Sequence, residues 1–299
     1  MPLKKLTCVV ASYNYADFLT ENLTSLCSQW KAEQPFDILI IDDGSSDNSL
    51  EIAREFSRSY EFITVVTHRK HKNLGLPKSI EKALEYVETE WICFLESDDI
   101  AKPDSINKIL SYIDEAKTKF FFFGIEPLLE EQSSRLWFDS YVPRIRSLMI
   151  KNGADKNPFN YERAILWENI IPTFSCVVIK KNVISQCNFN TPVTEWLDWY
   201  LWIQLSTKTK VMYLDEQLIY WRIHGNSQNR KKNFIDYLRK YRKFRKSVAQ
   251  LLWQTDTKKN YAKILILCLP AFVPLICRML NMYKYIGLKG LIKSVNERL

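Results

Sequence analysis

Three polar clusters in the first third of the chain each follow a short apolar run. The clusters are residues 12–14, 42–47 and 96–99, and the runs before them are 6–11, 36–41 and 91–95. Because ligands of α/β proteins bind at the carboxyl ends of parallel strands, we expect the three clusters to converge at one edge of a sheet. Carboxylates that face one crevice repel each other unless a cation lies between them, and such hard oxygen donors suit Mg²⁺ or Mn²⁺ with a phosphate-bearing ligand.

Each cluster also has a purely structural interpretation. Asp42-Asp43-Gly44-Ser45 is a good turn and helix cap, and Ser97-Asp98-Asp99 before a helix complements the helix dipole. Capping explains one cluster more easily than three at successive strand ends, so we favour a functional site.

The elements that must position these clusters alternate along residues 1–125. Runs rich in β-branched and aromatic residues alternate with stretches of helical period. The expected strands are 6–11, 36–41, 62–67, 91–95 and 119–125, and the expected helices are roughly 15–30, 47–58, 77–88 and 103–116. This pattern predicts a doubly wound α/β unit, whose mainly parallel sheet is covered by helices on both faces.

The second part of the chain is less regular. Residues 126–172 lose the alternation, and the signals then return as a strand, a Trp-rich helix, two strands, a basic helix and an apolar stretch. These elements are expected at 174–179, 195–206, 211–214, 218–224, about 233–253 and 264–277.

Composition excludes several classes of protein. Apolar residues make up 46% and charged residues 25% of the 299, which argues against global disorder. Gly is sparse, with 7 residues, and neither the dinucleotide fingerprint nor the P-loop pattern occurs. The 7 cysteines form no C-x-x-C pair, so we expect buried free thiols in a reducing compartment and no zinc site. No signal peptide precedes the first strand, and we therefore expect a cytoplasmic protein.

The charge divides unevenly along the chain. Residues 229–299 carry 17 Lys and Arg against 3 acidic residues, a net of +14, so the total of +8 leaves −6 for residues 1–228. The basic tail could be a solvated helix, a nucleic-acid surface or a membrane contact. It carries no nucleic-acid-binding motif, so we expect no nucleic-acid partner. Its apolar stretch of 14 residues contains Pro270 and Pro274 and is shorter than the roughly 20 residues of a spanning helix. We therefore favour in-plane attachment to an anionic membrane at the inner face of the cell membrane.

Six blocks, in order over about residues 5–228, resemble the family 2 glycosyltransferases. The opening residues Val9 to Asn14 and the second block Ile40 to Asp47 match the family pattern almost without interruption, and the other blocks follow in the family's order. Those blocks are 73–75, 94–99, 197–202 and 220–227. Ordered agreement of this kind is far more specific than any single block.

The resemblance implies a GT-A fold and inverting transfer of a sugar from a nucleoside-diphosphate donor, with a UDP-sugar favoured, to a glycan or lipid-linked acceptor in bacterial surface polysaccharide synthesis. It divides the chain into a domain at 1–228, with a nucleotide-sugar half (1–125) and an acceptor half (126–228), and a tail at 229–299. The end of the first strand and the loops after the second and fourth strands would bind the nucleotide, and Asp198 would be the general base. The nucleotide-binding set is Ala11, Tyr13, Asn14, Asp43 and Asp98, and the set around Mn²⁺ or Mg²⁺ is Asp98, Asp99 and His224.

Two positions depart from the family pattern. Glu96 stands where Asp is commoner, and its longer side chain could lie outside the metal's ligand sphere. Leu197-Asp198 replaces an acidic pair, so Glu195 is a rival base. Of the two, we favour Asp198. Its separation of about 100 residues from Asp99 fits a base on an element apart from the metal cluster, which single displacement needs.

Two other functions remain open at this point. A nucleotidyltransferase also uses acidic metal ligands on an α/β fold, but residues 9–14 do not supply its glycine-rich phosphate loop. A non-catalytic module that binds sugar nucleotides or membranes is the third possibility, and the retained Asp98, Asp99 and Asp198 argue against it.

Overall fold

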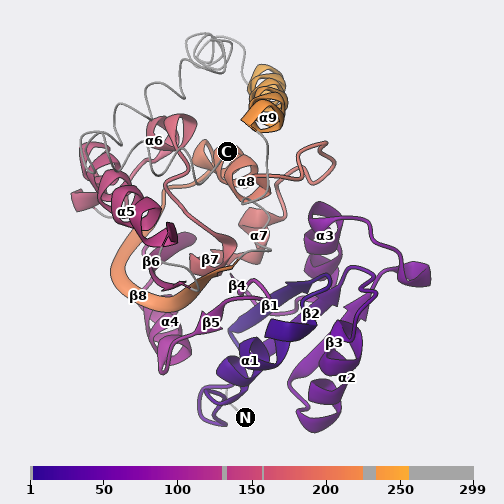
Figure 1. The fold of residues 1–299 in the computed structure, drawn as a ribbon. Helices are drawn as coiled ribbons and strands as arrows, with labels where there is room; N and C mark the ends of the chain where they lie inside the picture. The colour runs from indigo at the N-terminus through magenta and orange to yellow at the C-terminus, as the bar shows by residue number, and fades with distance from the viewer. Residues whose placement is uncertain (1–2, 130–132, 157, 225–233, 256–299) are drawn as a thin grey trace.

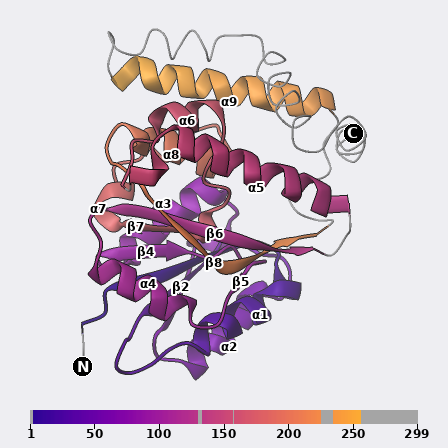
Figure 2. The same ribbon diagram turned by 90° about the vertical axis from the view of Figure 1, so that its left-hand side faces the viewer.

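The computed structural model describes residues 3–129, 133–156, 158–224 and 234–255. Its centre is one curled eight-stranded sheet in the order β3-β2-β1-β4-β7-β6-β8-β5. Helices α1, α2 and α4 lie on one face, α5, α6 and α8 on the other, and α9 lies outside α8 and α6 (Figures 1 and 2). The GT-A arrangement expected from the sequence is confirmed.

The nucleotide half forms as the alternating pattern predicts. Strands β1 (Leu6–Ser12), β2 (Asp37–Asp42), β3 (Ile63–Thr67) and β4 (Trp91–Phe94) pair in parallel. The helices between them are α1 (Ala16–Cys27), α2 (Ser49–Ser59) and α3 (Leu76–Tyr86), and α4 (Ser105–Asp114) follows β4. Nearly every side chain of β1 and β2 is buried, as expected for strands covered on both faces.

The acceptor half adds antiparallel pairs to the same sheet. Strand β7 (Val177–Lys180) runs antiparallel between β4 and β6 (Phe120–Leu129). The two-residue strand β5 (Ile100–Ala101) pairs antiparallel with β8 (Met212–Ile223), and β8 pairs in parallel with β6. Residues 120–123 of β6 are four consecutive buried phenylalanines that form the core of this half.

The expected pair of strands at 211–214 and 218–224 is wrong in one respect, because both belong to the single strand β8. The register against β6 pairs Phe123 with Leu214 but Gly124 with Gln217, which leaves two residues of β8 unpaired in a bulge. A Cβ on Gly124 would lie 3.1 Å from the carbonyl oxygen of Glu216, so glycine lets the bulged strand approach closely. The polar residues of the bulge gave the pattern of a turn.

Residues 126–172 contain more regular structure than their pattern predicts. Strand β6 continues to Leu129, and helices α5 (Ser133–Lys151) and α6 (Glu162–Trp167) follow it. A 3-10 turn at Phe174–Cys176 precedes β7, and the short helix α7 (Lys181–Ile184) follows it.

The Trp-rich helix is α8 (Leu197–Ser206), and the basic helix is α9 (Phe234–Thr255). Within the described ranges no helix is both long and apolar enough to cross a membrane. The apolar stretch at 264–277 lies outside the described residues.

Candidate active site

The loops after β1 and β2 are joined by side-chain hydrogen bonds. The backbone N–H of Asn14 donates to Ser45 Oγ at 3.0 Å, and the Ser46 N–H donates to Asn14 Oδ1 at 2.7 Å. Asn14 adopts a left-handed φ of 58°, which Asn tolerates better than most residues. Ala11 is partly buried at the end of the strand, and Tyr13 is 44% exposed. These contacts fix the two loops side by side and leave the Tyr13 ring accessible.

Asp43 fastens the β2 loop to the start of α3. Its two carboxylate oxygens accept the backbone N–H groups of Leu74 and Gly75 at 2.8 and 2.9 Å, and His68 Nε2 lies 3.3 Å from Oδ1. The next residue, Gly44, has a φ of 77°, and a Cβ there would lie 2.7 Å from the backbone nitrogen of Asn73. Asp43 is therefore a fixed part of the nucleotide half, with 5% of its surface exposed.

The loop after β4 carries Asp99 inward. Oδ1 of Asp99 accepts the backbone N–H of Arg222 on β8 at 2.9 Å, and Oδ2 accepts the hydroxyl of Ser175. Asn22 of α1 donates through Nδ2 to the carbonyls of Glu96 and Asp99, both at 2.8 Å. The loop is thus held by α1, by the turn before β7 and by β8.

Asp98 and His224 face each other across this loop. The distance between His224 Nε2 and Asp98 Oδ2 is 3.1 Å, and the Asp98 side chain is 15% exposed. The His224 ring lies 4.6 Å from the centroid of the Phe18 ring on α1. The structure therefore brings together the end of β8 and the β4 loop, as the order of the motifs predicts.

Burial and mutual repulsion oppose ionisation of this carboxylate group. Burial and then the charge of Asp98 raise the pKa of Glu96 to about 8, against a hydrogen bond from Thr173 that lowers it. The same causes, burial first, raise the pKa of Asp99 well above its ordinary value. Charge density of this kind is what a divalent cation relieves.

The donor set fits a cation that is shared with a substrate. In the described part of the chain no three His, Cys, Asp or Glu side chains gather into a complete metal site. Magnesium-like ions commonly use only one or two carboxylates and take their remaining ligands from water and phosphates. Asp98 supplies such a carboxylate and His224 a nitrogen donor beside it, whereas both oxygens of the buried Asp99 already accept hydrogen bonds, from Ser175 and Arg222.

Asp198 lies in the first turn of α8, on a different element from the β4 loop. Asn169 Nδ2 donates to its Oδ2 at 2.7 Å. Burial raises the pKa of Asp198 to about 6, while hydrogen bonds from the Trp199 backbone and from Asn169 act to lower it. The charge of Asp198 contributes to the raised pKa of Glu96, which shows that the two carboxylates are within electrostatic reach.

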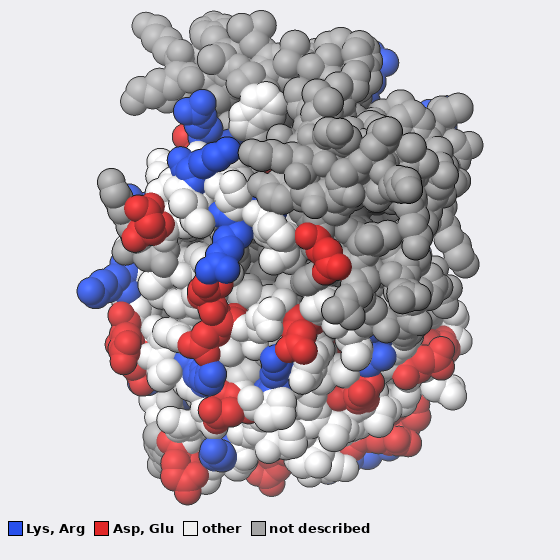
Figure 3. Space-filling view, turned by 60° about the vertical axis from the view of Figure 1, so that its left-hand side comes forward, with Lys and Arg blue, Asp and Glu red and all other residues white. Residues whose placement is uncertain are grey.

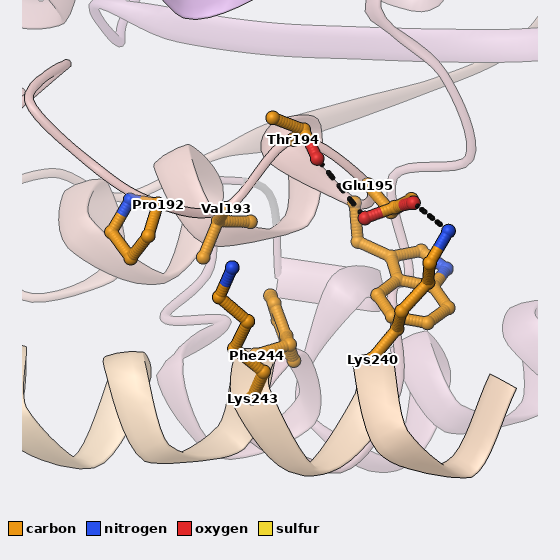
Figure 4. Close-up of a pocket in the computed structure, with 8 residues that line it drawn as sticks. Pro192, Val193, Thr194, Glu195, Lys240, Lys243 and Phe244 are labelled. Carbon is orange, nitrogen blue, oxygen red and sulfur yellow. Dashed lines mark hydrogen bonds and ion pairs between the residues drawn. The ribbon is translucent and has the colours of Figure 1, made fainter. Parts of the chain in front are cut away.

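The rival carboxylate, Glu195, is engaged elsewhere. Its Oε1 lies 2.5 Å from Lys240 Nζ on α9, and its Oε2 accepts the Thr194 hydroxyl at 3.0 Å (Figure 4). Between the two candidates, Asp198 has the hydrogen bonding and the raised pKa that suit a base at neutral pH.

Four residues of the site were not singled out from the sequence. Thr173 and Ser175 hold Glu96 and Asp99, Asn169 orients Asp198, and Arg222 contacts the β4 loop through its backbone and through Nε, which donates to the Asp98 carbonyl at 2.9 Å. Arg222 lies in the closing block, two residues before His224. Its backbone N–H makes the contact with Asp99, and any residue type could supply that group, so the sequence could not indicate it. The other three lie in or next to the segment where the pattern was irregular.

The sequence matches the family described as "Glycosyl transferase family 2" over residues 7–186. A curated relative, the putative teichuronic acid biosynthesis glycosyltransferase TuaG of Bacillus subtilis, is 25% identical over 74% of this chain and 80% of its own length. The alignments cover 38% and 66% of two other curated relatives, so the chain spans less than two thirds of their length.

Two solved structures share the fold. TarS 1–349 of Staphylococcus aureus in complex with UDP-GlcNAc gives a TM-score of 0.61 at 14% identity and covers 98% of this chain and 79% of that one. The mannosyltransferase PcManGT of Pyrobaculum calidifontis, in complex with GDP-Man and Mn²⁺, gives 0.59 at 10% identity, over 98% and 86% of the two chains. With the family match covering well over half of its residues, the chain belongs to glycosyl transferase family 2.

Proposed function

We propose that this protein is an inverting glycosyltransferase that moves a sugar from a nucleoside-diphosphate donor to a hydroxyl of a surface glycan. The observation that carries the proposal is Asp198, a buried carboxylate with a pKa of about 6 on α8, within electrostatic reach of the acidic β4 loop. The proposed proton acceptor is on α8 and the proposed leaving-group site is at the β4 loop, so the two lie on separate elements, as single displacement requires.

The donor's nucleoside would lie on the loops after β1 and β2. Ala11, Tyr13 and Asn14 line the first loop, and Asp43 anchors the second to the start of α3. Tyr13 offers an exposed ring, and Asp43 offers the remaining lone pairs of its carboxylate for an N–H of a base. The UDP-GlcNAc complex of TarS supports a uridine nucleotide.

Asp98 and His224 would hold a divalent metal, Mn²⁺ or Mg²⁺, with Asp99 behind them. The Mn²⁺ complex of PcManGT supports the choice of ion. When bound, the cation neutralises the charge that builds on the departing diphosphate. Ser175 and Arg222 keep Asp99 fixed beneath this pair.

Asp198 would act as the general base. Its carboxylate takes the proton of the acceptor hydroxyl while that oxygen forms a bond to the anomeric carbon of the sugar. The bond from this carbon to the diphosphate oxygen breaks, and its electron pair leaves with the nucleoside diphosphate. Asn169 holds Oδ2 in place during this transfer.

The relatives support a role in cell-surface polysaccharide synthesis, with a glycan or lipid-linked acceptor. TuaG is described as acting in teichuronic acid biosynthesis. We further propose that residues 1–228 form the catalytic unit and that 229–299 contact an anionic membrane surface on the cytoplasmic side. The described part of that segment, α9, carries six Lys and Arg against Asp236, a charge balance suited to anionic headgroups.

A panel of nucleotide sugars tests the proposed chemistry. The purified chain should release nucleoside diphosphate from one donor in the presence of Mn²⁺ and lose this activity with a chelator. Release of pyrophosphate would instead identify a nucleotidyltransferase. Absence of metal-dependent turnover with every donor would support a non-catalytic module.

Removal of residues 260–299 tests the membrane contact. The shortened chain should move from the membrane fraction to the supernatant after cell lysis. If it stays with salt-washed membranes to the same extent as the full chain, residues 260–299 are not the membrane contact, and α9 is the remaining candidate in the tail.

A further inference from the structure

A cavity of about 300 Å³ lies between α9 and the segment that leads into α8 (Figure 4). Its walls mix aliphatic, aromatic and charged side chains from these two parts of the chain. They are Pro192, Val193, Thr194, Glu195, Trp196, Lys240, Lys243 and Phe244. None of these residues belongs to the nucleotide or metal set described above.

The cavity has one unbalanced positive charge. Lys240 pairs with Glu195 at 2.5 Å, which neutralises both groups. Lys243 extends from α9 toward Pro192 and Val193, and no carboxylate of the described residues pairs with it (Figure 4). A small anion would find its counter-charge here, beside the rings of Trp196 and Phe244.

One residue of the cavity wall, Trp196, lies close to the proposed base in the sequence. Trp196 is two residues before Asp198, and because successive Cα atoms are about 3.8 Å apart, their Cα atoms lie within about 8 Å of each other. Trp196 also has a φ of 57°, a left-handed conformation that is rare for a bulky side chain. Strain of this kind gathers at binding and catalytic sites.

Aromatic contacts hold α9 against this strained turn. The Trp196 ring meets the rings of Tyr241 and Phe244 at centroid distances of 5.9 and 5.8 Å, and Trp199 meets Phe244 at 4.9 Å. The Lys243 ammonium is therefore presented by a helix that packs on the same turn that carries Asp198.

Helix α9, which forms one wall of the cavity, is basic, with six Lys and Arg against Asp236. On the face drawn in Figure 3, acidic side chains are more numerous in the lower half, where Lys and Arg side chains lie among them, and further Lys and Arg side chains lie higher up. An anion is favoured at the α9 end by the field of the whole helix as well as by Lys243.

We propose that this cavity binds an anionic group, a phosphate or carboxylate, of the acceptor glycan, and that Lys243 is its principal counter-charge. The inference rests on the proposed function, because it identifies the acceptor as one that carries negative charge near the hydroxyl that receives the sugar. A neutral acceptor would leave Lys243 without a partner.

Calorimetric titration of the full chain tests the site with glucose 6-phosphate and, as the uncharged probe, glucose. We expect glucose 6-phosphate to bind more tightly than glucose. Lys243→Gln should weaken binding of the phosphate probe about tenfold, and Lys243→Arg should keep most of it. The matched control is Lys246→Gln, an exposed lysine of the same helix outside the cavity, which should leave binding unchanged. Equal binding of the two probes, or equal losses in the Lys243 and Lys246 variants, would overturn the proposal.

A lipid headgroup could supply the same phosphate, so a second arm measures flotation with vesicles of phosphatidylglycerol in phosphatidylcholine. A Lys243→Gln defect seen with vesicles but not with glucose 6-phosphate would replace the acceptor site with a lipid contact. Turnover of a donor without binding of the probe would remove this inference alone. Binding of the probe without turnover of any donor would remove the proposed function alone.

Discussion

The nucleotide half and the acceptor half hold their candidate carboxylates in different ways. Asp43 and Asp99 accept hydrogen bonds from backbone N–H groups, so neighbouring elements fix them in place. Asp198 is fixed mainly by one side chain, Asn169, and by the start of its own helix. Backbone donors make a rigid cradle for a charged ligand, whereas a carboxylate with a single side-chain partner can still exchange a proton.

The difference also appears in the electrostatics. In the nucleotide half, repulsion among Asp98, Asp99 and Glu96 adds to burial in raising pKa values, which suits a cation site. Burial is the leading cause for Asp198 as well, but no neighbouring charge among the described residues adds to it, and its hydrogen bonds limit the rise of the pKa to about 6. These differences fit the proposal that the nucleotide half binds a metal and a diphosphate and that the acceptor half accepts a proton.

The largest effect is expected for Asp198→Asn, which removes the proposed base of the acceptor half and leaves the nucleotide half unchanged. An amide cannot accept the proton of the acceptor hydroxyl, so kcat for transfer should fall by about 10²–10⁴-fold. Donor affinity should stay unchanged, because Asp198 lies on α8, outside the nucleotide loops. Initial rates and calorimetry with the nucleoside diphosphate measure the two quantities. Glu195→Gln is the matched control; a loss of kcat in this variant as large as in Asp198→Asn would contradict the assignment.

Asp98→Asn alters the nucleotide half, and it should impair use of the donor rather than proton transfer from the acceptor. Removal of this carboxylate deletes a proposed metal ligand and the partner of His224. We expect kcat/KM for the donor to fall about 10²-fold, with weaker Mn²⁺ dependence. Asp17→Asn, an exposed residue of α1, serves as the control. If the Mn²⁺ dependence of Asp98→Asn were unaltered, Asp98 would not be a ligand of the metal.

The two halves also differ in how well the sequence predicts them. The strands at 6–11 and 36–41 and the loops after them follow from local alternation, because each βα unit repeats the same pattern and places its polar residues at the same edge. Thr173, Ser175 and Asn169 could not be found this way. Asn169 and Thr173 are ordinary polar residues in or next to the irregular segment, and Ser175 lies in a stretch expected as a strand but forms a 3-10 turn. The importance of Thr173 and Ser175 comes from the long-range pairing of β7 with β4.

Strand β8 shows the same limit. Its bulge of polar residues is typical of a turn, and only the pairing with Gly124 on β6 reveals a continuous strand. Because β8 is continuous, Arg222 and His224 reach the β4 loop. The closing block was predicted from the sequence, but the single strand that positions it was not.

Ser175→Ala tests whether the hydrogen bonds of the β4 loop in the nucleotide half contribute to the stability of the fold. The hydroxyl donates to Asp99 and accepts the Glu96 N–H at 2.9 Å, so its loss leaves two buried groups without a partner. We expect the free energy of unfolding to fall by about 1–3 kcal/mol, measured by urea denaturation. Ser111→Ala, which removes an exposed hydroxyl of α4, should change it little. A neutral Ser175→Ala would mean that the β4 loop does not depend on the turn before β7.

The smallest effect concerns the pH dependence of transfer. With a pKa of about 6, Asp198 is ionised at pH 7.5 and becomes protonated as the pH falls through about 6, so kcat/KM should drop about tenfold per unit on the acid side. The Asn169 hydrogen bond favours the ionised form, and its loss in Asn169→Ala should raise this pKa and move the acid limb to higher pH by about one unit. A variant such as Asn107→Ala, at a partly exposed position on α4, should leave the limb in place. If Asn169→Ala lowered the rate equally at every pH, Asn169 would position the acceptor rather than set the pKa of the base. The hydrogen bond to Asp198 would then have a purely positioning role, like those to Asp43 and Asp99 in the nucleotide half.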